Sequence, residues 1–78
     1  MTLRELNAGQ TARIDKIDAR QPGVVRLMVL GLIEGVEVRH ANSAIGGDPM
    51  EVSVHGTAIS IRKQQADYFR ISPINQNV

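Results

Sequence analysis

One apolar stretch, residues 24–38, constrains the fold more than any other, because its hydrophobic period changes within it. The residues that keep the i, i+3, i+4, i+7 spacing of one helical face are Val24, Leu27, Met28 and Gly31. Gly31 suits a left-handed C-terminal cap, after which Leu32 can fold back onto the helix. From Val36 onwards, apolar and polar residues alternate as in a half-buried strand. The stretch therefore predicts a short helix over Val24–Leu30, a tight turn and a strand.

The rest of the chain alternates mostly with period two, which is typical of short strands. Strands are expected over residues 11–18, 36–42, 50–55, 57–62 and 68–71, and helical turns over 3–6 and 63–67. The first strand needs a bulge between Asp15 and Lys16 to return Ile17 to the core face. A sheet this small buries its apolar face most easily by curling on itself. The pattern predicts a mainly β fold, a small SH3-like barrel of about five strands with one short helix between the first two.

Length and cysteine content limit the domain organisation. A chain of 78 residues allows one domain, which we expect over residues 1–71, followed by a flexible polar tail over 72–78. The chain has no cysteine, so neither a disulfide nor a thiolate ligand or nucleophile is available. A small extracellular domain usually needs disulfides, and their absence therefore favours an intracellular setting.

Charge and hydropathy exclude two classes of partner. The net charge is +1 and the largest basic cluster is Arg62-Lys63, so no nucleic-acid partner is expected. The longest apolar run, Leu27 to Ile33, is far shorter than the ~20 residues of a membrane span. The N-terminus lacks the apolar centre of a signal peptide. We therefore expect a cytoplasmic protein that does not insert directly into a membrane.

Several spaced motifs together point to a known family. They are Leu3-x-x-Leu6-x-x-Gly9, Arg26-Leu27-x-x-Leu30-Gly31-Leu32-x-x-Gly35, Gly47-Asp48-Pro49, a hairpin at Gly56, Ile59-x-Ile61-Arg62, and Ala66 and Ile71 in the closing segment. In this order and spacing they resemble the ferrous iron transport protein A (FeoA) family, over about Leu3 to Ile71. Two features depart from it: Ala44-Ile45-Gly46 lacks the proline that many members carry, and His40 stands where the family usually has an aliphatic residue.

The resemblance implies an accessory protein of bacterial ferrous iron uptake that acts by protein–protein interaction. Its partner would be the membrane ferrous iron transporter that carries a GTP-binding domain. The family has no established catalytic residues, so the resemblance implies neither an enzyme nor a cofactor. It leaves open whether the protein regulates the GTPase or the assembly of the complex, and whether it self-associates weakly.

Two histidines are the candidate metal ligands. The imidazoles of His40 and His55 suit Fe(II) or Zn(II), and Glu37 or Glu51 could join them. Fifteen residues separate the two histidines, a spacing that matches no local metal motif, so we expect no metal site. A metal-sensing or metal-binding domain that uses His40 and His55 is the alternative function.

Catalytic sites have less support in the sequence. Asp15, Asp18 and Asp48 are carboxylates that general acid–base chemistry could use, but a domain this small has little room for the pocket that it needs. We expect Asp48 to bond the backbone of its own turn. Gly46-Gly47 is followed by Asp48-Pro49 instead of the Lys-Ser/Thr of a phosphate-binding loop. No catalytic residue is therefore proposed.

The expected helix provides the candidate partner surface. Val24, Leu27 and Leu30 are expected to cap the aliphatic barrel. Arg26, Met28 and Val29 then remain for another protein, since an arginine beside surplus apolar residues is typical of an interface.

Overall fold

The chain forms a curled five-stranded antiparallel sheet. The computed structural model describes residues 1–74. Its elements are η1 (Leu3–Glu5), β1 (Thr11–Ile17), α1 (Val24–Val29), β2 (Glu37–Ser43), β3 (Met50–Val54), β4 (Thr57–Ile61), α2 (Lys63–Ala66) and β5 (Phe69–Pro73). The strand order is β4-β3-β2-β1-β5, so the expected mainly β fold with a short helix between the first two strands is confirmed.

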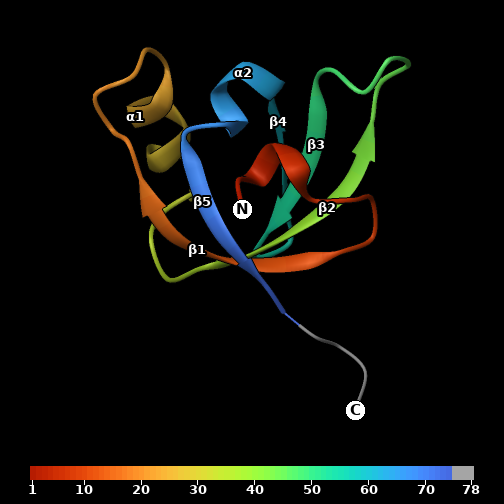
Figure 1. Ribbon diagram of the computed structural model, residues 1–78, viewed down its shortest axis with the longest axis horizontal. Coiled ribbons are helices and arrows are strands. Elements are labelled where there is room, and N and C mark those ends of the chain that lie inside the picture. Colours follow the sequence, from red (N-terminus) through yellow and green to blue (C-terminus); the bar gives the residue numbers. More distant parts are fainter. Residues whose placement is uncertain (75–78) are drawn as a thin grey trace.

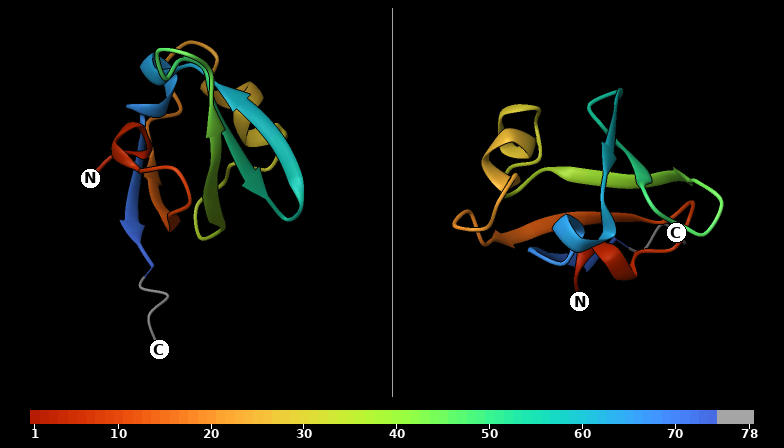
Figure 2. Two further views of the ribbon diagram at one scale, coloured as in Figure 1. Left: turned by 90° about the vertical axis from the view of Figure 1, so that its right-hand side faces the viewer. Right: turned by 90° about the horizontal axis from the view of Figure 1, so that it is seen from above.

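The three helical segments are arranged around this sheet. In Figure 1, α1 and α2 lie at the same end of the sheet as the β2–β3 loop, and η1 lies below α2 and beside β5. Seen from above in Figure 2, β1 and β2 run side by side, and the β3–β4 hairpin turns away from them. The sheet thus curls around its apolar face, as its small size requires.

The expected bulge in β1 is present. Along the β1–β5 pair, Ile14 lies opposite Ile71 and Lys16 opposite Arg70, so Asp15 is the extra residue. Ile17 then packs against the core. The bulge lets one strand change its register without exposing its last apolar residue.

The β3–β4 connection is a two-residue hairpin turn. Val54 pairs with Thr57, and the two residues between them have positive φ, 51° at His55 and 79° at Gly56. Positive φ at both central positions matches the twist of the flanking strands. The expected hairpin at this place is confirmed.

The core is aliphatic apart from Phe69. It draws on every strand and helical segment, and its largest fully buried side chains are Phe69, Leu3, Ile14, Leu27, Leu32, Met50, Ile61, Val24, Val38 and Val52. The inward residues of β3 and β4 alternate as the period-two pattern predicts. Val36, which was expected in a strand, precedes β2 and is half-buried against the core.

The C-terminal strand is longer than the sequence indicated. A tail was expected from residue 72, but Ser72 and Pro73 belong to β5, and Ile74 N–H donates to the Thr11 carbonyl at 2.9 Å. Proline is compatible with this place because β5 is an edge strand of the sheet. Residues 75–78 of the expected tail lie outside the described residues.

The described helices, of which α1 (Val24–Val29) is the longest, are far shorter than the ~20 residues of a membrane span. In the part of the chain that the structure describes, no helix is long and apolar enough to cross a membrane.

Candidate functional site

The C-terminus of α1 is fixed by two backbone hydrogen bonds. Leu32 N–H donates to the Leu27 carbonyl at 3.1 Å, and Gly31 N–H donates to that of Met28 at 3.0 Å. These are the two bonds of a Schellman motif, whose left-handed position is Gly31 with φ of 125°. Leu27 and Leu32 are fully buried and supply its apolar contact. The expected cap at Gly31 and the return of Leu32 are confirmed.

The outer face of α1 and its following turn is apolar and exposed. The exposed fractions are 57% at Val25, 81% at Val29, 49% at Leu30 and 46% at Ile33. Arg26, also exposed, is three residues before Val29 and four before Leu30, so it shares their face of the helix. We call these five residues the α1 patch. Single exposed apolar residues are ordinary, but a group on one short element is typical of an interaction surface.

The α1 patch differs from the surface expected from the sequence in four positions. Met28 was expected on the outside but is half-buried against the core, whereas Leu30 was expected in the core and is half exposed. Met28 lies four residues after the buried Val24 and so shares its face of the helix, whereas Leu30 lies six residues after it. Sequence reasoning missed Val25 and Ile33, although both lie four residues from Val29.

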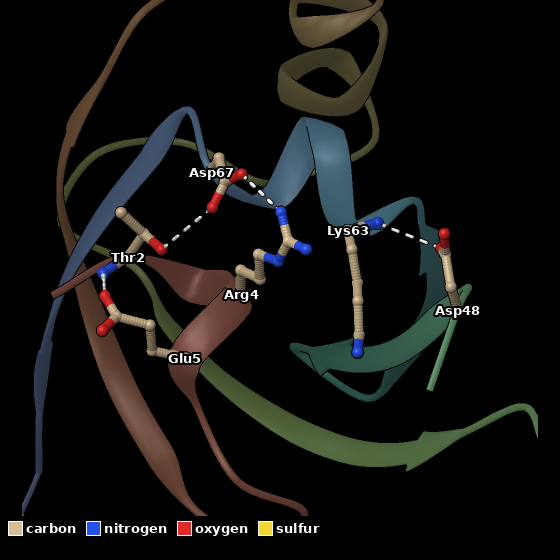
Figure 3. A network of polar contacts seen from close by, with 6 residues as sticks. All are labelled: Thr2, Arg4, Glu5, Asp48, Lys63 and Asp67. Atoms are coloured by element: carbon tan, nitrogen blue, oxygen red, sulfur yellow. Dashed lines mark hydrogen bonds and ion pairs between the residues drawn. The ribbon is translucent and has the colours of Figure 1, made fainter. Parts of the chain in front are cut away.

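The short helix α2 is held in place by groups distant in sequence. The Asp48 carboxylate accepts a hydrogen bond from Lys63 N–H at 3.1 Å, and Arg4 forms an ion pair of 2.9 Å with Asp67 (Figure 3). The Asp48 contact corrects the expectation that Asp48 bonds its own turn. The first N–H groups of a helix have no partner within it, and Arg62 gives α2 no side-chain cap, so a remote carboxylate takes that place.

Two long side chains of α2 reach glycines of the neighbouring segments. A Cβ at Gly47 would lie 2.7 Å from Lys63 Nζ, and one at Gly23 would overlap the amide of Gln65. Gly47 belongs to the β2–β3 loop, and Gly23 is the residue before α1. The side chains of Lys63 and Gln65 therefore lie against the loop and the start of α1, respectively.

The two candidate metal ligands lie in different environments. His40 is 7% exposed, with Nδ1 2.7 Å from the Leu6 carbonyl and Nε2 2.6 Å from Ser43 Oγ. His55 is exposed in the β3–β4 turn. Since His40 pairs with Val52 across β2 and β3, the two histidines are about 10 Å apart along the strand.

The carboxylates do not complete a metal site either. Within residues 1–74, no three side chains of His, Cys, Asp or Glu come together as a metal ion would need. Both nitrogens of His40 already contact protein oxygens, with Nε2 also 3.0 Å from the Asn42 carbonyl. The polar contacts of His40 explain how a histidine fits where an aliphatic residue is usual in the family that the sequence resembles.

The other candidate carboxylates are ionised and engaged. Hydrogen bonds from Arg20 and Gln21 lower the pKa of Asp18 to about 2. A hydrogen bond from Ser72, and to a smaller extent Arg13, lowers the pKa of Asp15. A general acid at neutral pH needs a raised pKa, so neither environment suits that role.

Comparison with known proteins assigns this architecture to a family. The family model described as FeoA domain matches residues 1–73. The chain belongs to the FeoA domain family. The expectation drawn from the spaced motifs is thus confirmed, and the family is associated with ferrous iron transport. No individually curated protein matches the chain.

Solved structures of FeoA proteins share the fold. The Chlorobium tepidum FeoA protein is 32% identical with a TM-score of 0.87, and the match covers 100% of this chain and 74% of that one. An iron(II) transport protein A from Clostridium thermocellum is 27% identical with a TM-score of 0.87, covering 95% of this chain and 46% of that one.

A third solved structure describes the fold type. The Stenotrophomonas maltophilia FeoA, complexed with zinc, is 29% identical with a TM-score of 0.80, and the match covers 92% of this chain and 89% of that one. It is described as a prokaryotic SH3 domain protein and suggested to act as a ferrous iron transport activating factor. The SH3-like fold expected from the sequence is therefore confirmed.

Proposed function

We propose that this protein is an accessory of bacterial ferrous iron uptake that binds the membrane transporter carrying a GTP-binding domain. The observation that carries the proposal is the FeoA domain match over residues 1–73. The description of the Stenotrophomonas maltophilia relative as a transport activating factor supports the same role. A non-enzymatic, binding role on the cytoplasmic side is the form of the proposal that a domain of this size favours.

The α1 patch is the proposed contact surface. Val29 is the most exposed of its apolar residues at 81%, and the patch combines aliphatic side chains with Arg26, a residue type enriched in interfaces. Met28, which was first expected in this surface, supports it from below, because its side chain packs on the core.

Uptake of ferrous iron in cells tests the proposal. Val29→Asp and Arg26→Glu should lower uptake, and lower the co-purification of the transporter with a tagged protein, while thermal melting of the purified variants stays unchanged. Exposed substitutions usually alter stability by only ~0.5 kcal/mol. The matched control is Ile45→Asp, which places the same charge on the fully exposed residue of the β2–β3 loop and should leave uptake intact.

Two results would contradict the surface assignment. If Val29→Asp and Arg26→Glu leave uptake and co-purification unchanged, the α1 patch is not the contact. If Ile45→Asp lowers both instead, the β2–β3 loop takes its place. The alternative function, a metal-binding domain using His40 and His55, has less support, because both ring nitrogens of His40 contact protein oxygens.

A further inference from the structure

An open cleft lies where the end of β1 meets the start of β5. Its volume is about 590 Å³, and it is lined by Lys16, Ile17, Asp18, Ala19, Arg20, Asp67, Tyr68 and Arg70. None of these residues belongs to the α1 patch. Backbone pairing holds its two sides together, since Asp18 N–H donates to the Tyr68 carbonyl at 3.0 Å. The cleft is therefore a fixed feature of the sheet.

The acidic residues of the cleft are already neutralised. The carboxylate of Asp18 accepts hydrogen bonds from Arg20 Nε at 3.0 Å and from Gln21 at 3.1 Å. The carboxylate of Asp67 forms the ion pair with Arg4 and is contacted by the Thr2 hydroxyl at 3.5 Å (Figure 3). Neither acid remains available to balance another cation in the cleft.

Two cations of the cleft lack such a counter-charge. Lys16 and Arg70 lie directly opposite each other across β1 and β5, and among residues 1–74 neither has an ion-pair partner. Like charges at directly opposed strand positions are unfavourable. The same strand avoids the problem elsewhere, since Arg13 lies opposite Glu37 and forms an ion pair with Asp15. The uncompensated pair thus lies in the cleft.

Apolar surface lies beside these two cations. Ile17 and Tyr68 are among the residues that line the cleft, and both are only partly buried. A small inorganic anion would leave this apolar surface and most of the cleft volume unfilled. A ligand that combines negative charges with an aliphatic side chain matches both features.

We propose that this cleft binds an acidic peptide segment of another protein, with its carboxylates on Lys16 and Arg70 and an aliphatic side chain against Ile17 and Tyr68. The segment is held by side chains rather than by strand addition. The outer edge of β5 is already paired with the N-terminus, through Ile71 N–H to the Met1 carbonyl at 2.9 Å and the Thr2–Arg70 bridge. This proposal stands independently of the transporter contact at the α1 patch.

Fluorescence anisotropy of the purified protein with a labelled peptide, Glu-Glu-Leu-Glu-Glu, tests the proposal. Lys16→Ser and Arg70→Ser should each raise the Kd of the peptide about tenfold, because each removes a charge-assisted contact. Arg39→Ser is the matched control, since it removes one exposed arginine from β2, outside the cleft, and should leave the Kd unchanged. The same peptide with glutamine in place of glutamate should not bind, and added salt should weaken the complex.

A second variant keeps the test decisive if a neutral substitution disturbs the strands. Lys16→Glu places an opposite charge across from Arg70, so the domain stays folded while peptide binding is lost. The proposal is overturned if Arg39→Ser weakens binding as much as Lys16→Ser, or if the glutamine peptide binds equally well. It is also overturned if inorganic phosphate displaces the peptide at equal concentration, which would make the cleft an anion site only.

Discussion

At the scale of single residues, the backbone of Gly31 determines where α1 ends. Its φ of 125° lies where residues with a Cβ are strained, and its turn brings Leu32 back to the core. Gly31→Ala should lower the free energy of unfolding by about 1–3 kcal/mol. Urea denaturation measures the loss. Val29→Ala is the control in the same helix and should be near neutral, since alanine favours helix; an equal loss in both variants would refute this role of Gly31.

Asp18 gives a pH dependence at the same scale. Its pKa is lowered from 3.8 to about 2, mainly by the Arg20 side chain, so the folded state favours the ionised form. The stabilisation is therefore complete above the unfolded pKa and disappears as pH falls through about 2. The stability difference between the parent and Asp18→Asn should shrink over this interval in urea denaturation. A carboxyl titration by NMR with an inflection near the unfolded value of 3.8 would contradict this account.

At the scale of elements, the β1–β5 pair carries unfavourable charge where Lys16 opposes Arg70. Lys16→Glu should stabilise the pair by about 0.2–1 kcal/mol, as opposite charges do at directly opposed strand positions. Arg13→Glu is the reciprocal change, because it places a second acid opposite Glu37 and beside Asp15, and it should destabilise. Urea denaturation at low and high salt measures both effects, which should diminish with salt. If both variants shift stability in the same direction, the charge pattern is not the cause.

Helix α2 depends on a carboxylate from another element. Asp48→Ala removes the acceptor for Lys63 N–H and should cost about 0.5–2 kcal/mol, the usual cost of losing a helix cap. Faster hydrogen exchange of the α2 amides should accompany the loss. Asp48→Asn keeps a side-chain oxygen and is expected to lose less. Unchanged α2 exchange in Asp48→Ala would show that the packing against Gly23 and Gly47 is sufficient to hold the helix.

At the scale of the whole molecule, local patterns predicted the elements better than the surfaces they form. The alternation of apolar and polar residues predicted β3 and β4, and Gly31 predicted where α1 ends. Both signals are contained in a few neighbouring residues. Helical spacing alone placed Met28 with the buried Val24 and Leu27, whereas the exposure of Leu30 depends on which elements pack around the end of α1.

The β1–β5 cleft illustrates the same limit. It depends on the register that brings Lys16 opposite Arg70, and that register includes a bulge between strands far apart in the chain. The bulge itself was predictable from the parity of Ile17, but the residue that would face Lys16 was not. The remote cap from Asp48 to Lys63 was missed for the same reason, since fifteen residues separate its two ends.

The curled sheet as a whole depends on β3, whose Val52 is fully buried between His40 of β2 and Ile59 of β4. Val52→Asp should unfold the domain, because an unpaired buried carboxylate costs several kcal/mol. A core of this size supplies only about 3–5 kcal/mol in total. Loss of dispersion in the amide NMR spectrum and of the far-ultraviolet strand signal measures the result. Val52→Ala should instead stay folded with a lower melting temperature, and Val29→Asp should melt like the parent. A folded Val52→Asp would mean that this position reaches water, and that the aliphatic interior does not hold the sheet together as one unit.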